Sequence, residues 1–180
     1  MSKRKAKTTK KTAAKKSVAA PFISTGFWLM KSEPETYSID DFERDKRTLW
    51  DGVRNYQARN FMMKSMRPGD RFLFYHSNAD PSAAVGIGRI AKINQPDPSA
   101  LDPKSKYYDP KATPENPIWF CAEVEFEMRL PNPVSLQEMR ERKELKNMLL
   151  LRPGQRLSVL PVTREEFQVI LKMGGLGQRC

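Results

Sequence analysis

The sequence predicts an α+β fold in which a mixed, curled sheet or open barrel carries helices at its periphery. Short apolar runs typical of strands alternate with helical patterns, but without the regular strand–helix rhythm of a doubly wound sheet. Turn residues and helix caps separate these runs, and no internal repeat is present. The 180 residues fit one domain plus a tail, and such a domain needs no disulfide or metal to fold.

The first half of the chain predicts two strands and two helices. Residues 27–30 are an apolar run, interpreted as the first strand, and Pro34 ends it. Ser38 and Asp41 have capping-box spacing and open a short helix. A second helix is expected over residues 53–66. One stripe of that helix should face the core, namely Ala58, Phe61, Met62 and Met66.

The middle of the chain predicts two further strands. Residues 72–75 are apolar on both faces, so this strand should be central in the sheet. Residues 85–90 form another strand, in which Gly86 and Gly88 share one face. These glycines either let a ligand approach the backbone or permit a tight bend of the barrel, and both readings stay open.

The second half of the chain begins with a long irregular segment. Residues 94–117 hold six of the fourteen prolines, and the aromatic residues between them favour a loop that packs down as a flap beside a site. Residues 118–128 alternate as a half-buried strand. Two more capping boxes follow, Ser135 with Glu138 and Thr163 with Glu166, and they flank a final strand at 156–160.

Positive charge is concentrated at the start of the chain. The net charge is +11, but residues 1–21 contain eight basic residues and no acid, which leaves a folded part of only +3. We expect this lysine-rich arm to be disordered and to contact nucleic-acid phosphates without reading sequence. A solubilising tail or an anionic membrane surface are the alternatives. The phosphate-binding candidates are Lys3, Arg4, Lys5, Lys7, Lys10, Lys11, Lys15 and Lys16.

Several chemistries are disfavoured by what the sequence holds. The two cysteines are far apart in the sequence, which favours a reduced intracellular protein without disulfides. His76 is the single histidine, so a multi-histidine metal site is excluded and no metal or other cofactor is expected. No apolar run is long enough to cross a bilayer. His76 and Ser77 are neighbours on a strand and point to opposite faces, so they do not form a nucleophile–base pair.

Three polar-aromatic clusters are the candidate site. They are residues 31–34, residues 50–60 and residues 75–77. Two follow strands, and the ends of strands converge with nearby loops in a curled sheet, so one pocket could collect all three. Aromatic walls with polar edge groups suit a flat, hydrogen-bonding ligand such as a nucleobase. Core filling is the alternative role for Trp28, whereas Trp50 lies between Leu49 and Asp51 and is a better candidate wall.

These clusters resemble a known family. The runs 27–34, 50–60, 74–77 and 85–88, together with 102–110 and 156–162, are similar to the EVE domain from about Phe27 to Met173. The resemblance implies a PUA-like pseudo-β-barrel of mixed strands with peripheral helices, related to the YTH readers of methylated adenine. We therefore expect one EVE domain over residues 22–180 after the arm over 1–21.

The resemblance also implies a function. We expect non-enzymatic binding of a modified base in DNA or RNA, with the base flipped into the pocket. The expected ligand-binding residues are Trp28, Lys31, Ser32, Glu33, Trp50, Val53, Arg54, Asn55, Tyr56, Tyr75, His76 and Ser77.

Two alternative functions remain compatible with the sequence. One is a glycosylase or hydrolase with Glu33 or Asp51 as the acid and His76 as the base. The other is a nucleoid-compacting protein that acts through its arm. Nucleic acid is the expected partner and no membrane is expected. The expected location is the cytoplasm with the nucleoid in a bacterium, or the nucleus in a eukaryote.

Overall fold

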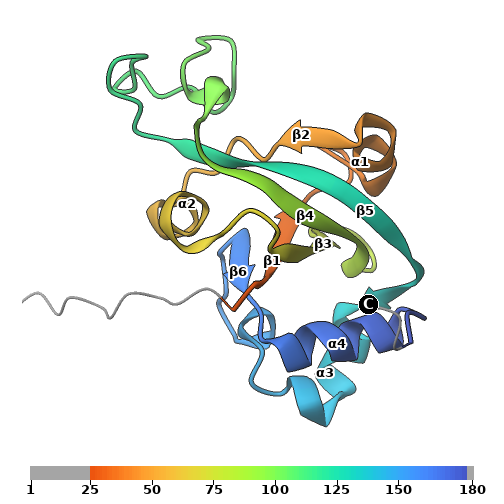
Figure 1. Cartoon of the computed structure of the whole chain (residues 1–180). Coiled ribbons are helices and arrows are strands. Elements are labelled where there is room, and N and C mark those ends of the chain that lie inside the picture. Colours follow the sequence, from red (N-terminus) through yellow and green to blue (C-terminus); the bar gives the residue numbers. More distant parts are fainter. Residues whose placement is uncertain (1–24, 178–180) are drawn as a thin grey trace, which may run out of the picture.

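The computed structural model describes residues 25–177, and Figure 1 shows their arrangement. The predictions for the basic arm at 1–21 fall outside the described residues. The strands are β1 (Phe27–Ser32), β2 (Arg47–Leu49), β3 (Arg71–His76), β4 (Ala83–Pro96), β5 (Phe120–Ser135) and β6 (Val159–Pro161). The helices are α1 (Ile39–Asp45), α2 (Tyr56–Asn60), α3 (Leu136–Glu141) and α4 (Arg164–Met173). Single turns of other helix types lie at Phe61–Ser65, Pro98–Ala100, Lys143–Leu145 and Leu149–Leu151.

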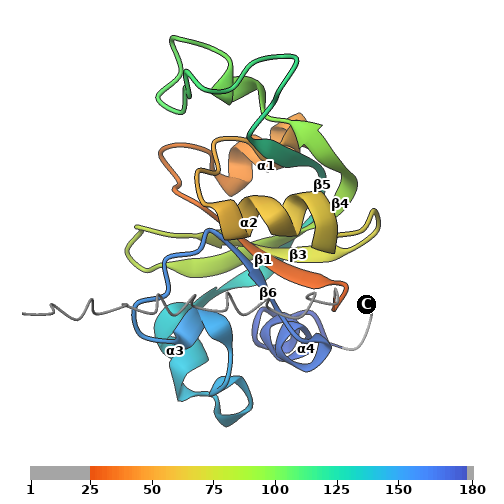
Figure 2. The same ribbon diagram turned by 90° about the vertical axis from the view of Figure 1, so that its left-hand side faces the viewer.

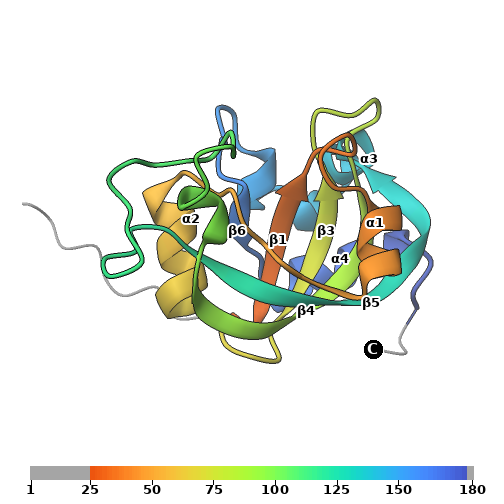
Figure 3. The same cartoon turned by 90° about the horizontal axis from the view of Figure 1, so that it is seen from above.

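The strands of residues 25–177 form one mixed sheet. Its order is β2-β5-β4-β3-β1-β6, in which β1 and β3 are parallel and the other neighbours antiparallel. Seen from above in Figure 3, β4 and β5 curve around β1 and β3 without closing the sheet. This arrangement confirms the predicted mixed, curled sheet.

The central strands β3 and β4 contribute side chains to hydrophobic cores on both sides of the sheet. Alternate residues of β3 separate in this way: Phe72 and Phe74 pack in the core beside α1 and α2, whereas Leu73 and Tyr75 pack in the core beside α3 and α4. Figures 1 and 2 both place α3 and α4 together on the side away from α1. The double-sided apolar pattern of residues 72–75 therefore correctly predicted a central strand.

The three predicted capping boxes are all present. Ser38, Ser135 and Thr163 are the N-caps of α1, α3 and α4, and each hydroxyl accepts the backbone N–H three residues later. In each box the acidic side chain at that third position also accepts the N–H of the capping residue. These local bonds satisfy backbone donors that a helix end leaves unpaired, which is why spacing alone located the helices.

Several predicted boundaries are wrong. The helix expected over 53–66 begins at Tyr56, because Asn55 is its N-cap, and it changes to a π-helical turn at Phe61–Ser65. Its apolar stripe is nevertheless buried as predicted. The strand expected at 85–90 is longer at both ends in β4, and the strand expected at 118–128 begins at Phe120 and continues to Ser135 in β5. These two strands pair along their length through several bulges. The last strand spans Val159–Pro161 rather than 156–160.

The paired glycines of β4 serve the packing of the sheet. A Cβ added at Gly88 would lie 2.4 Å from Phe72 Cζ and 2.8 Å from the carbonyl oxygen of Glu125. At Gly86 it would lie 2.5 Å from Ile39 Cδ1. The space above both glycines is thus filled by the side chains of the core. Of the two explanations for these glycines, approach of a ligand or a tight bend of the sheet, the structure supports the tightly packed bend.

We predict that Gly88→Ala lowers the free energy of unfolding by about 1–3 kcal/mol, because the added methyl meets an aromatic ring and a backbone oxygen. Urea unfolding followed by circular dichroism measures this. Gly177→Ala is the matched control, since nothing lies within 4 Å of its Cβ position. Equal stability of the two variants would contradict the packing role.

Candidate ligand-binding site

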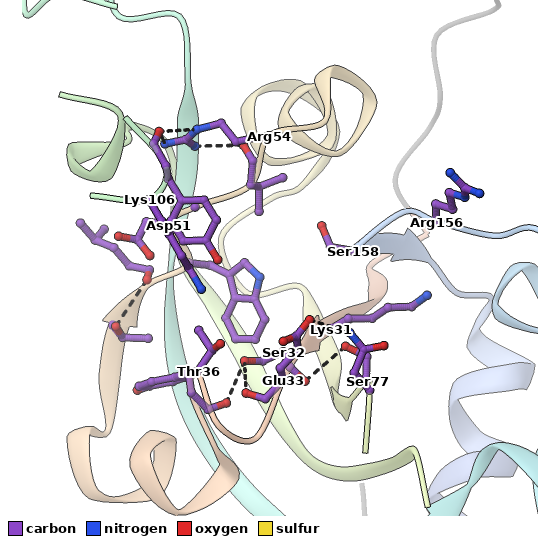
Figure 4. A pocket seen from close by; sticks show the side chains of 18 of the residues that line it. Lys31, Ser32, Glu33, Thr36, Asp51, Arg54, Ser77, Lys106, Arg156 and Ser158 are labelled. Atoms are coloured by element: carbon purple, nitrogen blue, oxygen red, sulfur yellow. Dashed lines mark hydrogen bonds between the residues drawn. The ribbon is translucent and has the colours of Figure 1, made fainter. Parts of the chain in front are cut away.

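A hollow of about 610 Å³ lies at the edge of the sheet where β1 and β3 end (Figure 4). Its volume is within the range of small-molecule pockets, roughly 300–1,000 Å³. Segments far apart in the sequence contribute to it: the loops after β1 and β3, the segment from β2 to α2, the long loop before β5 and the segment before β6. Lys31, Ser32, Glu33, Trp50, Val53, Arg54 and Ser77 are the predicted site residues that line it.

The parallel pairing of β1 and β3 brings two of the predicted clusters together. Ser32 is paired with His76 in the register, so the chain leaves both strands at the same edge. The backbone N–H of Ser77 donates to the carbonyl oxygen of Ser32 over 2.9 Å. Just beyond, Asn78 Nδ2 donates to Glu33 Oε1 over 2.6 Å. This edge of the hollow is therefore held by bonds between the two loops.

Trp50 is a fixed aromatic wall of the hollow. Its ring meets Phe72 and Phe74 edge-on, with centroid distances of 5.8 and 5.4 Å, and its backbone N–H donates to Ala122. The residue is 7% exposed. Its indole N–H has no acceptor among residues 25–177, where every fully buried side-chain nitrogen or oxygen has a partner. That donor is therefore not sealed in the core and is available to a ligand.

Arg54 ties the long loop to the rim of the hollow. Its guanidinium donates to Asp97 Oδ2 over 2.7 Å, to Ser99 Oγ over 3.1 Å and to the carbonyl oxygen of Tyr107 over 2.8 and 2.5 Å. The side chain of Asp97 is 1% exposed, so this is a nearly buried ion pair. Asp97 also accepts the N–H of Gly52. The loop at residues 94–117 thus packs down beside the hollow, as its aromatic residues predicted.

Gly52 makes room for the wall that this loop supplies. Its φ is +73°, and an added Cβ would lie 2.6 Å from Tyr107 Cε2. Only a residue without a side chain accepts both the positive φ and the adjacent ring without strain. The Tyr107 ring can therefore lie directly against the backbone that follows Trp50 and Asp51.

The charges of the hollow are unevenly distributed. Four basic residues and two acids line it. Figure 4 shows Lys31, Arg156 and Ser158 on one side, and Asp51, Arg54 and Lys106 on the other. Burial lowers the pKa of the Lys31 ammonium from its ordinary value. Neither Lys31 nor Arg156 forms an ion pair with any of residues 25–177. A partly buried cation without a counterion is stabilised by an anionic ligand.

The carboxyl group of Asp51 has the opposite electrostatic setting. Partial burial, followed by the nearby charge of Asp97, raises its pKa from the ordinary value, while its own backbone N–H and Arg54 act against this. The group lines the hollow and can accept hydrogen bonds from a ligand. The hydroxyl of Ser32, by contrast, already donates to the carbonyl oxygen of Tyr37 over 2.8 Å. It is left as an acceptor for a ligand.

Five predicted residues do not line the hollow, and the expectation that they would do so is corrected. Trp28 is fully buried and donates to Asp70 Oδ2 over 2.8 Å. Tyr75 faces the core beside α3 and α4, because side chains alternate along β3. Asn55 Oδ1 caps α2 by accepting two backbone N–H groups. Tyr56 is exposed on α2. The fifth is His76.

His76 supports the start of α1. Its Nε2 accepts the backbone N–H of Ile39 over 3.1 Å, and its ring packs against Phe74. Burial lowers its pKa, the charge of Arg129 adds to this, and the charges of Asp40 and Glu35 oppose it. Protonation of Nε2 would remove the acceptor that Ile39 uses.

Several lining residues were not among the expected ligand-binding residues, although Asp51 and Gly52 lie in the predicted cluster at 50–60. They are Thr36, Tyr37, Thr48, Leu49, Asp51, Gly52, Asn78, Lys106, Tyr107, Gln155, Arg156 and Ser158. The aromatic residues of the loop at 94–117 did indicate a wall here. The contribution from residues 155–158 had no local signal, since it arises because β6 pairs with β1 and places the preceding segment beside Lys31.

Two further findings concern residues 25–177. No group of three or more His, Cys, Asp or Glu side chains is placed to bind a metal ion there. In the same range, no helix combines the length and apolarity that a membrane span requires.

Comparison with known proteins identifies the family. The family model of the EVE domain matches residues 26–173. The chain belongs to the EVE domain family. Membership and the open mixed sheet together confirm the resemblance and the PUA-like α+β fold.

Relatives of this EVE domain come from distant organisms. Human thymocyte nuclear protein 1 is 37% identical over 165 residues, which cover 81% of this chain and 72% of that protein. A solved structure of a Leishmania major protein has a TM-score of 0.80 and 43% identity, and covers 89% and 99% of the two chains. The crystal structure of human THYN1 protein in complex with DNA that contains 5-methylcytosine has a TM-score of 0.76 and 36% identity, and covers 82% and 96%.

Because His76 is the single histidine of the chain, it should dominate the pH dependence of stability near neutrality. Its folded pKa lies below the unfolded value near 6.5, so the unfolded chain takes up the proton first as pH falls. We predict that the free energy of unfolding is highest above about pH 7 and falls as pH drops through the unfolded value near 6.5. Urea unfolding across this window measures it. His76→Gln should flatten the slope, and an unchanged slope would contradict the prediction.

Proposed function

We propose that this protein binds a modified nucleobase of DNA or RNA in the hollow beside Trp50, without catalysing a reaction. The observation that carries this proposal is the hollow itself. It combines a fixed indole wall that has an available N–H donor with a carboxyl acceptor at Asp51 and unpaired cations at Lys31 and Arg156. A nucleotide offers the matching parts: a flat ring, polar edges and a phosphate.

The similarity to human THYN1 protein supports the same proposal. That relative has been crystallised with DNA that contains 5-methylcytosine, and it shares the fold and 36% of the aligned residues. The inferred ligand class for this chain is therefore a base that carries a small substituent. A pocket gains only about 1–3 kcal/mol from one such group, so we expect moderate discrimination against the unmodified base.

The charge distribution favours one orientation of the bound nucleotide. We place its phosphate at the side of Lys31 and Arg156, where the cations have no protein counterion. The base then points toward Trp50 and Asp51. A base in a duplex must be flipped out to reach this position, which costs a few kcal/mol. Single-stranded nucleic acid avoids that cost and should bind more tightly than duplex.

The enzymatic alternative has no specific support. The base that it needs, His76, does not line the hollow, and its Nε2 is occupied by the N–H of Ile39. Glu33 does line the hollow, and Asn78 donates to its carboxylate.

The basic arm completes the proposal. We infer that residues 1–21 add affinity for phosphates while the hollow supplies discrimination, in a nucleus or beside a bacterial nucleoid. A nucleoid-compacting protein that acts through its arm alone would instead lose all nucleic-acid binding when the arm is deleted.

Trp50→Ala should weaken binding of a single-stranded oligonucleotide with one central 5-methylcytosine by about 5- to 150-fold, because the stacking surface is lost. Fluorescence anisotropy with modified and unmodified oligonucleotides measures this. Wild type should prefer the modified strand.

Asp51→Asn is the companion variant, because truncation of the nearly buried Trp50 also removes packing. Asp51 is more exposed, so this variant should keep the fold and lower discrimination between the two strands. Circular dichroism checks folding of both variants. Equal affinity of wild type for the two strands, unchanged by either substitution, would refute the proposal.

Deletion of residues 1–21 should lower affinity for modified and unmodified strands by the same factor. The slope of log affinity against log salt should become shallower by about 0.7 for each lost phosphate contact with a single strand. Titrations at several salt concentrations measure both effects. Loss of all binding on deletion would favour the nucleoid-compacting alternative, whereas an unchanged slope would show that the arm does not contact phosphates.

A further inference from the structure

A continuous series of contacts between rings and guanidinium groups connects the wall of the hollow with the surface of α2. The guanidinium of Arg54 lies 5.5 Å from the Tyr107 ring centre and 5.2 Å from that of Trp119. Trp119 stacks on Tyr56, with ring centres 4.8 Å apart and planes inclined by 22°. Two lining residues of the hollow, Arg54 and Tyr107, are thus continuous with an outer aromatic pair.

Tyr56, at the outer end of this series, is exposed. Tyr56 is 59% exposed, although tyrosines are usually at least half buried in a folded domain. Trp119 covers one part of its ring and is itself only 6% exposed. The indole N–H of Trp119 donates to Asp109 Oδ2 over 2.7 Å, which fixes the ring that supports Tyr56. An aromatic stack that ends at the surface can be extended by another flat ring.

The surroundings of Tyr56 carry uncompensated positive charge. The guanidinium of Arg59 lies 4.7 Å from the Tyr56 ring centre. It donates to the carbonyl oxygen of Ile118 and to Asn60 Oδ1, which are neutral acceptors. Arg59 forms no ion pair with any of residues 25–177, and the carboxylate of Asp109 is held by Trp119 and by the backbone N–H of Lys111. An anionic ligand with flat rings matches this combination better than an apolar protein surface does.

The packing role of this stack is the alternative explanation. Tyr56 and Trp119 connect α2 with the start of β5, and Arg59 bonds to the same segment through Ile118. The burial of Trp119 is what a packing role requires. The large exposure of Tyr56 is not explained by packing.

We propose that Tyr56, backed by Trp119 and flanked by Arg59, is a second stacking platform that holds a nucleobase next to the one in the hollow. This proposal rests on the proposed function, because the hollow is taken to hold the first base. The platform gives the protein a grip on a flanking nucleotide whatever its identity, since every base has a face that can stack. The protein would therefore bind a short single-stranded segment rather than one isolated nucleotide.

The test compares Tyr56→Ala, Tyr56→Phe and wild type on four single-stranded oligonucleotides. Two carry a central 5-methylcytosine or cytosine between intact bases. The other two are the same strands with abasic positions on both sides of the central base. Tyr108→Ala is the matched control, because Tyr108 is 42% exposed and stacks on no ring among residues 25–177. Fluorescence anisotropy gives the affinities.

On the strands with intact flanks, Tyr56→Ala should bind about 5- to 150-fold more weakly than wild type, whether or not the central base is modified. Tyr56→Phe keeps the ring and should bind like wild type, as should Tyr108→Ala. On the abasic strands, Tyr56→Ala and wild type should bind equally, since no flanking base remains to stack.

Equal binding of Tyr56→Ala and wild type on the intact strands would overturn the platform. So would an equal loss on the abasic strands, because the ring would then act only through packing or the backbone. The proposed function fails in a different way, when wild type does not distinguish the modified from the unmodified strand. The intact unmodified strand still tests the platform in that case.

Discussion

The ion pair between Arg54 and Asp97 is the contact on which the geometry of the site depends. Arg54 follows the segment that carries Trp50, and Asp97 begins the long loop that supplies Tyr107. The carboxylate of Asp97 also accepts the N–H groups of Gly52 and Ser99. Removal of one partner of such a pair leaves a buried charge, which costs about 3–5 kcal/mol. The loop is therefore held as a wall and the hollow is formed before any ligand arrives.

The fixed parts of the site are an aromatic wall and two strand ends, and its unpaired parts are two basic side chains. Trp50 is held edge-on by two phenylalanines of β3, and the parallel ends of β1 and β3 fix Ser32 and Ser77. A preformed wall lowers the cost of ordering on binding. The cations on the other side, Lys31 and Arg156, have no counterion within residues 25–177 and are available to a phosphate. The site thus separates recognition of the ring from recognition of the charge.

Local patterns in the sequence predicted much of this fold, whereas pairing between distant segments limited the rest. Capping boxes located α1, α3 and α4, because their hydrogen bonds span only three residues. The double-sided apolar run identified β3 as central. By contrast, Tyr75 was expected in the pocket although it faces the opposite core. Alternation places Phe74 and Tyr75 on opposite sides of the sheet, but the side on which the pocket forms depends on the pairing of distant segments, and no local pattern reports that.

The most direct test of the central claim is a crystal structure of this protein with a single-stranded oligonucleotide that contains one 5-methylcytosine. We predict that the ring of the modified base lies in the hollow against Trp50, with its phosphate toward Lys31 and Arg156. A base bound elsewhere on the domain, with the hollow empty, would contradict it.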